Sequence, residues 1–101
     1  MKNFVTEIIS FRLVQSFTEA EINKRVTILN DFYKQLEGYH EQLCICKDSD
    51  NEYTLILKWS SFECEKEASA KMMKSSQTSL FKAMVDPKTV NKKLYTAYHI
   101  K

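Results

Sequence analysis

The sequence has very little glycine, proline or cysteine, and it has no long apolar run. Its 101 residues include one glycine, one proline and three cysteines. Three cysteines, an odd number, do not make the disulfide framework of a small secreted domain. No apolar stretch approaches the ~20 residues that span a bilayer, and the first residues do not have the pattern of a signal peptide. These absences favour a cytoplasmic protein with reduced thiols and no membrane segment.

The charges of the chain are balanced and dispersed. Fifteen basic and thirteen acidic residues give a formal charge of +2. This pattern argues against a nucleic-acid-binding surface and against a polybasic membrane anchor. The length predicts one domain over residues 1–101. At 44% hydrophobic residues the chain can bury a core, but a chain this short leaves apolar surface uncovered, which self-association could cover.

The clearest structural signal lies between Glu52 and Glu63. Apolar residues alternate with others from Tyr53 to Trp59, which is the period-two pattern of a buried strand. Ser60 and Glu63 then have the spacing of a capping box. We therefore expect a strand that ends on a tryptophan and leads directly into a helix from Phe62 to about Lys74.

The rest of the chain gives three more strands and another helix. The first strand has apolar residues on both faces, so that either Phe4 and Ile8 or Val5 and Ile9 need a cover other than the helices. The predicted elements are a strand from Phe4 to Val14, a helix from the Thr18–Glu21 capping box to Gly38, a strand from Tyr39 to Lys47, a turn from Asp48 to Asn51, another helical turn or two around Leu80–Val85, and a strand from Leu94 to Ile100. The order is strand, helix, strand, strand, helix, strand. It predicts a ferredoxin-like βαββαβ α+β sandwich, with a four-stranded antiparallel sheet and two helices on one face.

Nearly the whole chain resembles the antibiotic biosynthesis monooxygenase-like domains of the dimeric α+β barrel superfamily. The resemblance lies in the long first strand, the Gly38-Tyr39 step, the third strand ending in Trp59, the capped helix at Ser60-Ser61-Phe62, and Ser79-Leu80-Phe81. It implies a homodimer in which two sheets pack face to face. It also implies cofactor-independent oxygenation of a small aromatic or phenolic molecule. There the substrate's own anion reduces oxygen, and the protein supplies a dry pocket with polar groups.

The resemblance also bears on cofactors. Haem-degrading members use a histidine in the second helix, where this chain has Ala68 and no histidine. The resemblance therefore implies that the protein uses no haem, and we expect no other metal or cofactor. Whether the chain is an enzyme is left open at this point. The alternative is a non-catalytic dimer of the same fold that binds a small apolar ligand or a protein partner.

Four residues are candidates for lining a ligand cavity: Trp59, Tyr33, Tyr98 and His99. Each also has an ordinary structural interpretation. Trp59 could be a large core residue at the start of a helix, and the two tyrosines could be interior packing residues whose hydroxyls need partners. His99 could act as an acid or base, or it could lie at a strand end or an interface.

The cysteines do not form a predicted metal site. His40, Cys44 and Cys46 share one face of a strand, but residues two apart on a straight strand are held parallel, ~6.6 Å from each other. A zinc ion needs donors that converge on one point. These thiols, with Cys64, are therefore interpreted as small buried side chains. Arg12 is interpreted as one half of an ion pair between strands.

An RNA-binding RRM domain has the same strand order, so it has to be considered. Such domains carry a basic consensus that contains glycine on the third strand. Here the strand that ends at Trp59 has no glycine, and the chain has no basic cluster. The sequence therefore disfavours this alternative.

Overall fold

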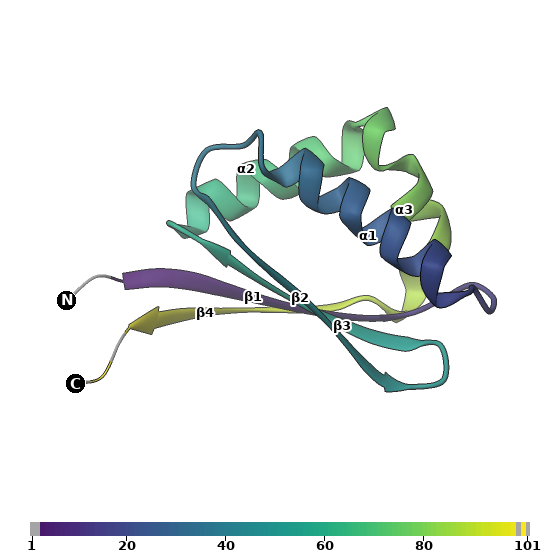
Figure 1. The fold of residues 1–101 in the computed structure, drawn as a ribbon. Coiled ribbons are helices and arrows are strands. Elements are labelled where there is room, and N and C mark those ends of the chain that lie inside the picture. Colours follow the sequence, from purple (N-terminus) through teal and green to yellow (C-terminus); the bar gives the residue numbers. More distant parts are fainter. Residues whose placement is uncertain (1–2, 99, 101) are drawn as a thin grey trace.

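The protein folds into one antiparallel sheet with its helices on one face. The computed structural model describes residues 3–98 and residue 100. The strand order is β2-β3-β1-β4, and the helices lie together above the sheet (Figure 1). This confirms the predicted ferredoxin-like α+β fold. The elements are β1 (Asn3–Arg12), α1 (Glu19–Tyr33), β2 (Tyr39–Ser49), β3 (Glu52–Trp59), α2 (Phe62–Lys74), the 3-10 turn η1 (Ser76–Thr78), α3 (Ser79–Met84), the 3-10 turn η2 (Pro87–Thr89) and β4 (Asn91–Tyr98).

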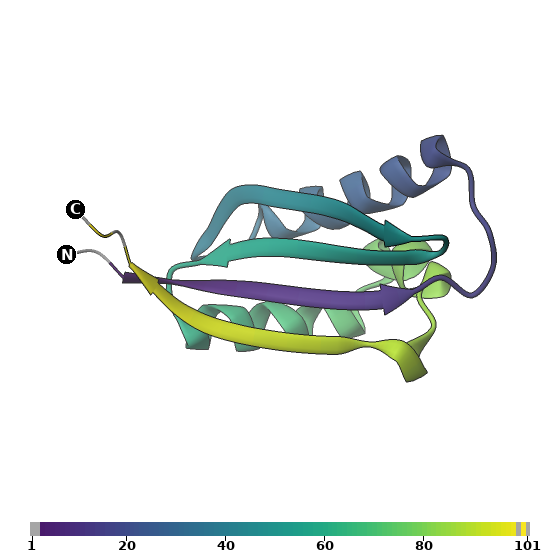
Figure 2. The ribbon, with the colours of Figure 1, turned by 90° about the horizontal axis from the view of Figure 1, so that it is seen from below.

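The first strand, β1, lies inside the sheet between β3 and β4 (Figure 2). Val5 is opposite Trp59 on β3 and opposite Thr96 on β4. Because side chains alternate along a strand, odd-numbered β1 residues such as Val5 face the helices. Even-numbered residues such as Ile8 lie on the other side of the sheet, which we call the open face. It carries Phe4, Thr6, Ile8 and Ser10 of β1, Ile56 of β3 and Tyr95 of β4.

The core lies between the sheet and the helices. Its most buried large side chains include Trp59, Leu55 and Leu57 of β3, and Leu29 of α1. The Tyr33 ring meets the Trp59 ring edge-on, with centroids 5.2 Å apart and planes at 87°, which is a favoured aromatic geometry. The predicted burial of Trp59 at the junction of sheet and helices is thus confirmed.

The first helix starts as predicted but ends early. Thr18 Oγ1 accepts a 3.1 Å hydrogen bond from the Glu21 backbone N–H, so the predicted N-cap is correct. The helix ends at Tyr33 rather than at Gly38, because the chain tightens into turns there: the Leu36 N–H donates to the Tyr33 carbonyl, three residues back. Gly38 does have a positive φ, +81°, but it serves the entry to β2 instead of the end of α1.

The second helix is capped one residue later than predicted. Ser61 Oγ, and not Ser60, accepts a 3.1 Å hydrogen bond from the Cys64 N–H. The Ser60 N–H instead donates to the Gly38 carbonyl at 2.8 Å. This bond joins Ser60 to the segment that leads into β2, so the cap moves to the next serine.

Two strand ends also differ from prediction. The last strand begins at Asn91 rather than Leu94, because Asn91 lies opposite Ser10 and pairing with β1 continues from there to Tyr98. Ile100 lies beyond the strand, which ends at Tyr98.

The first strand ends at Arg12 rather than at Val14. The Arg12 guanidinium is 2.6 Å from Glu52 Oε1 on the neighbouring strand β3. That contact confirms the predicted ion pair between strands.

The hairpin between β2 and β3 is tighter than predicted. β2 extends two residues past Lys47 to Ser49, and the turn narrows to Asp50 and Asn51. Asn51 has a φ of 61°, a conformation that asparagine tolerates better than most residues.

Among the described residues, no helix is both long and apolar enough to cross a bilayer.

Candidate functional site

A cavity lies between the helix layer and the sheet, next to β1 and β4. Its volume is about 280 Å³. Most of its wall is apolar and includes Ile9 of β1, Met72 of α2 and Phe81 of α3. Four side chains with polar groups also line it: Glu7, Tyr33, Ser69 and Lys92. An apolar cavity with a few convergent polar groups is the usual form of a small-molecule site.

A second hollow of about 310 Å³ adjoins the first. The two share the lining residues Ile9, Met72, Met73, Phe81 and Val90. The second hollow extends toward Phe11, Val85 and Pro87. Val90 is 43% exposed, so it marks the place where the shared wall reaches solvent.

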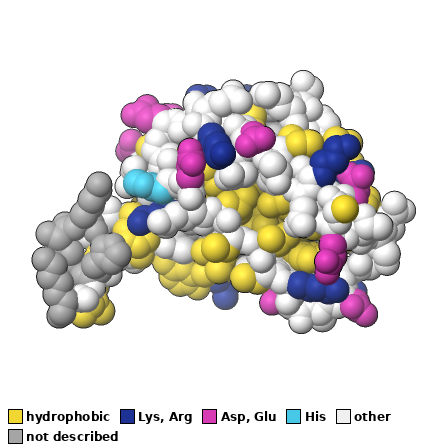
Figure 3. All heavy atoms as spheres, viewed as in Figure 1, with side chains coloured by type: hydrophobic (Ala, Val, Ile, Leu, Met, Phe, Trp, Pro, Cys, Tyr) yellow, Lys and Arg dark blue, Asp and Glu magenta, His cyan; other side chains and the backbone are white. Residues whose placement is uncertain are grey.

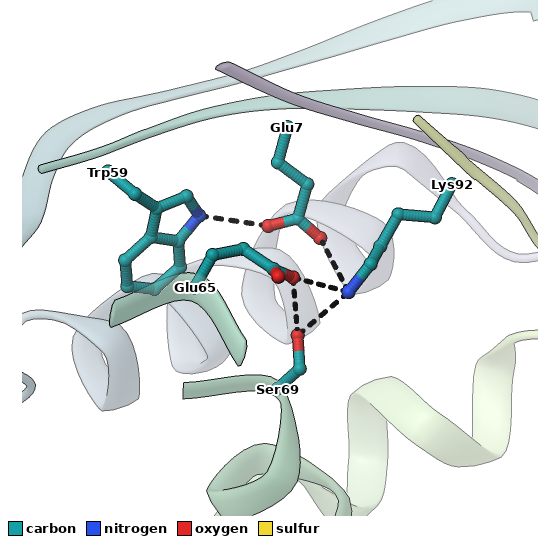
Figure 4. Close-up of polar contacts among 5 residues, drawn as sticks. All are labelled: Glu7, Trp59, Glu65, Ser69 and Lys92. Carbon is teal, nitrogen blue, oxygen red and sulfur yellow. Dashed lines mark hydrogen bonds and ion pairs between the residues drawn. The ribbon is translucent and has the colours of Figure 1, made fainter. Parts of the chain in front are cut away.

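Three of the polar side chains that line the cavity belong to a cluster that is drawn together from four elements (Figure 4). This Glu7 cluster consists of Glu7, Trp59, Glu65, Ser69 and Lys92. The Trp59 Nε1–H donates a 2.9 Å hydrogen bond to Glu7 Oε1. The other carboxylate oxygen, Oε2, lies 3.9 Å from Lys92 Nζ. The Glu7 carboxylate is thus held on one side by a hydrogen bond and faces an ammonium group on the other.

The ammonium group is fixed by the second helix. Glu65 and Ser69 are four residues apart on α2 and therefore share one helix face. Lys92 Nζ forms an ion pair with Glu65 Oε2 and donates to Ser69 Oγ at 3.0 Å. The Ser69 hydroxyl donates to the same Glu65 oxygen at 2.7 Å. These three groups hold each other and leave Glu7 as the more loosely paired carboxylate.

Burial controls the electrostatics of the cluster. Glu7 is 3% exposed and Glu65 is 2% exposed. Burial raises the pKa of Glu7 above its ordinary value, and the Trp59 hydrogen bond and Lys92 oppose this effect. Burial, together with the charges of Glu7 and Glu65, also raises the pKa of the Tyr33 hydroxyl far above its ordinary value. Tyr33 therefore remains neutral at physiological pH.

The structure places the four predicted cavity residues differently. Tyr33 lines the cavity. Trp59 is completely buried and lies behind Glu7; it is not one of the described residues that form the wall. Tyr98 is on the helix-facing side of β4 but is 54% exposed, and it lies at the opposite end of that strand from Lys92. His99 lies outside the described residues.

Sequence reasoning missed Glu7, Glu65 and Lys92. Glu7 did give a signal, since it is a lone carboxylate between Val5 and Ile9 on the inward face of a strand. Lys92 gave none, because the predicted last strand began two residues after it. Glu65 stands among other charged residues of α2, and only the packing of that helix on the sheet buries it.

The cysteines differ from expectation in their burial. Cys44 and Cys46 are exposed rather than buried, because they lie on the open face opposite Ile56 and Thr54, where no helix covers the sheet. Cys64 is partly buried, and all three thiols are free. Within the described part of the chain, no group of three histidine, cysteine or acidic residues is placed to hold a metal ion.

A smaller hollow of about 160 Å³ lies at the other edge of the sheet, between α1 and β2. Hydrophobic side chains are visible between the helix layer and the sheet on this side of the molecule (Figure 3). The hollow is lined by Ile22, Ile45 and Tyr53, with Glu19, Asn23 and Lys47. No hydrogen-bonded cluster like that around Glu7 joins these three polar residues, so the cavity beside the Glu7 cluster is the better candidate site.

Comparison with known proteins gives structural neighbours only. No protein-family model matches the chain, and no curated protein matches it closely enough to indicate a relative. Solved structures do match. SnoaB, a cofactor-independent oxygenase from Streptomyces nogalater, has a TM-score of 0.75 at 20% identity, over 97% of this chain and 96% of its own.

Two further neighbours cover nearly the same span. A candidate antibiotic biosynthesis monooxygenase from Bordetella bronchiseptica has a TM-score of 0.72 at 14% identity, over 98% of this chain and 99% of its own. A nipsnap family protein of unknown function from Agrobacterium tumefaciens has a TM-score of 0.62 at 17% identity, over 99% of this chain and 93% of its own. Identities this low establish shared architecture rather than shared chemistry. The chain thus has the fold of the antibiotic biosynthesis monooxygenase-like domains.

Proposed function

We propose that the protein is a monooxygenase that acts on a small aromatic or phenolic compound without a bound metal, flavin or other cofactor. The compound would bind in the cavity between α2, α3 and the sheet. Its anion would reduce oxygen, and the chain would supply the apolar wall and the polar groups. SnoaB, which has the same fold, is a cofactor-independent oxygenase.

One observation carries this proposal: an apolar cavity has a buried carboxylate and an ammonium group at one place on its wall. Ile9, Met72 and Phe81 offer surface to an aromatic ring. Lys92 is placed to stabilise negative charge that develops on a ligand oxygen. A charged group held in place beforehand stabilises such charge without having to reorganise during the reaction, and Glu65 and Ser69 hold the partly exposed Lys92 in this way.

We further propose that the chain, as one domain over residues 1–101, forms a homodimer through its open face. The helices cover only the other side of the sheet. The open face carries Ile8 and Ile56 as well as Tyr95, which is 49% exposed. Two such faces packed together would cover this apolar surface.

We also propose that the protein works in the cytoplasm. The three free thiols are in keeping with that reducing compartment.

Oxygen uptake with a panel of hydroxylated naphthalenes, in metal-free buffer, tests the activity. Val90→Trp should place a large ring where the cavity reaches solvent and lower the rate at least tenfold. Val14→Trp is the matched control, because Val14 is similarly exposed and lies outside the two hollows. The control should retain the wild-type rate.

The alternative, a non-catalytic dimer that binds a small apolar ligand, gives a different result in the same assay. The naphthalenes would bind to the wild type and not to Val90→Trp, but oxygen uptake would stay at the protein-free rate. If the folded wild type neither binds these compounds nor consumes oxygen, both functions assigned to this cavity are wrong.

A further inference from the structure

We propose that Glu7 is a specificity-determining residue that makes the cavity select an uncharged ligand bearing a hydroxyl group. The inference rests on the proposed role of the cavity in binding an aromatic ligand, and it adds the charge and the polar group of that ligand. It is carried by the arrangement of the Glu7 cluster, in which each charged group limits what can bind beside it.

The first limit concerns anions. The cluster holds two buried carboxylates, Glu7 and Glu65, and one ammonium group, Lys92. Its net charge is therefore negative when both carboxylates are ionised. A ligand carboxylate or phosphate would bring another negative charge beside Glu7, which is only 3% exposed, and like charges held close together repel each other. The cavity should therefore bind poorly any ligand that already carries a negative charge in solution, whereas a neutral hydroxyl can enter and lose its proton after it is bound.

The second limit concerns cations. A ligand ammonium beside Glu7 would lie next to Lys92, whose Nζ is 3.9 Å from Glu7 Oε2. Lys92 cannot easily move away, since Glu65 and Ser69 hold it. Lys92 therefore repels a ligand ammonium, but it does not repel an uncharged hydrogen-bond donor. A hydroxyl brings a hydrogen bond without a net charge.

The acceptor for that hydroxyl is Glu7 Oε2. Trp59 occupies the other carboxylate oxygen, Oε1, at 2.9 Å, and so acts as a positioning residue. Oε2 forms an ion pair with Lys92 Nζ at 3.9 Å, which is beyond hydrogen-bonding distance, so Oε2 can still accept a hydrogen bond. Glu7 lines the cavity, and hydrogen bonds to a charged acceptor are stronger than those between neutral groups, so a ligand hydroxyl that donates to Oε2 would be held firmly.

Three probes with the same two-ring frame test the inference by calorimetry at neutral pH: 2-naphthol, 2-naphthoate and 2-naphthylmethylamine. The wild type should bind 2-naphthol at least tenfold more tightly than either charged probe. Glu7→Gln should reduce the preference for 2-naphthol over 2-naphthoate at least tenfold, because it removes one negative charge and keeps the shape. Lys92→Gln should instead improve binding of the amine relative to 2-naphthol.

Glu67→Gln is the matched control, because Glu67 is an exposed glutamate on the same helix as Glu65; its selectivity should equal that of the wild type. Near-ultraviolet circular dichroism of Trp59 reports whether each variant is folded, and Lys92→Gln tests the inference if Glu7→Gln does not fold. Equal binding of 2-naphthol and 2-naphthoate by the wild type would overturn the inference and leave the proposed function standing. If the wild type binds no probe, the proposed function fails and this inference fails with it.

Discussion

The indole of Trp59 donates a hydrogen bond to the carboxylate of Glu7, although the two residues are 52 positions apart in the chain. They lie on the neighbouring strands β1 and β3, and both are almost completely buried. The most buried aromatic residue of the core thus also orients the carboxylate of the candidate site. A change at Trp59 should affect stability and binding together.

Replacement of Trp59 should be costly even when bulk is kept. Trp59→Phe loses the N–H and leaves Glu7 Oε1 buried without its donor, which should lower the free energy of unfolding by about 1–3 kcal/mol. Trp59→Ala also removes packing and should cost about 3–5 kcal/mol. Urea denaturation measures both changes. In a Glu7→Leu background the cost of Trp59→Phe should become much smaller; an unchanged cost would show that the hydrogen bond contributes little.

Glu7 should make stability depend on pH in a defined direction. Its pKa is raised by burial above the ordinary value of 4.5, so the folded chain keeps this proton at pH values where the unfolded chain has lost it. The stability that Glu7 contributes is therefore fully present below about pH 4.5 and is lost as the pH rises through the raised pKa.

Glu7→Gln provides the comparison for this pH effect. The difference in unfolding free energy, wild type minus Glu7→Gln, should fall as the pH rises from 4 to 8 in urea titrations. Glu65, Lys92 and Tyr33 face Glu7 and are present in both proteins, so the difference between the two reports mainly on Glu7. A difference that stays constant with pH would contradict the raised pKa.

Gly38 should tolerate no side chain. Its φ is +81°, and a Cβ at this position would lie 2.4 Å from Cys64 Sγ. Gly38→Ala combines a strained backbone with this clash and should lower the unfolding free energy by more than ~1 kcal/mol. Adding Cys64→Ala should recover only the part of the loss that comes from Sγ, because the Cys64 Cβ would still lie 2.7 Å from the new Cβ and the backbone strain would remain. If the second substitution recovers nothing, the contact with Cys64 is not the cause.

The open face should control self-association. Ile56→Asp places a charge at the centre of this face, opposite Ile8 on the neighbouring strand, and should convert the expected dimer into a monomer in equilibrium sedimentation at micromolar concentration. Val14→Asp is the control, because Val14 is exposed and lies outside the sheet. A monomeric wild type would rule out the proposed dimer.

The order of apolar and polar residues in the sequence was sufficient to predict those elements in which buried side chains recur at regular spacing. Residues 52–59 alternate between buried and half-buried side chains along the whole of β3, so its bounds were predicted correctly. The end of α1 was not predicted correctly, because a glycine at position 38 could either end the helix or lead into the next strand. The hydrogen bond from the Ser60 N–H to the Gly38 carbonyl places Gly38 at the entry of β2. This bond joins residues that are distant in sequence, so a local pattern cannot reveal it.

The candidate site was less predictable for a related reason. The Glu7 cluster takes its members from β1, β3, α2 and β4, and none of these elements shows a motif that points to the others. Only the register that sets Glu7 opposite Leu57 and Leu94, with the packing of Glu65 above them, brings the charges together. Tyr33 was predictable as a residue of the apolar helix face, while its position on a cavity wall was not.

The position of β1 between β3 and β4 has a consequence for folding and for local opening. β2 and β3 are joined by a short turn and can pair early, whereas Ser10 must meet Asn91 from the far end of the chain, and such distant contacts form slowly. β2 and β4 are both edge strands, but β2 is tied to β3 by the short turn whereas β4 is paired only with the distant β1, so partial unfolding should begin at β4. When β4 detaches, Glu7 and Glu65 lose their shared cation at once, and the fourth strand therefore completes both the sheet and the charge balance of the cavity.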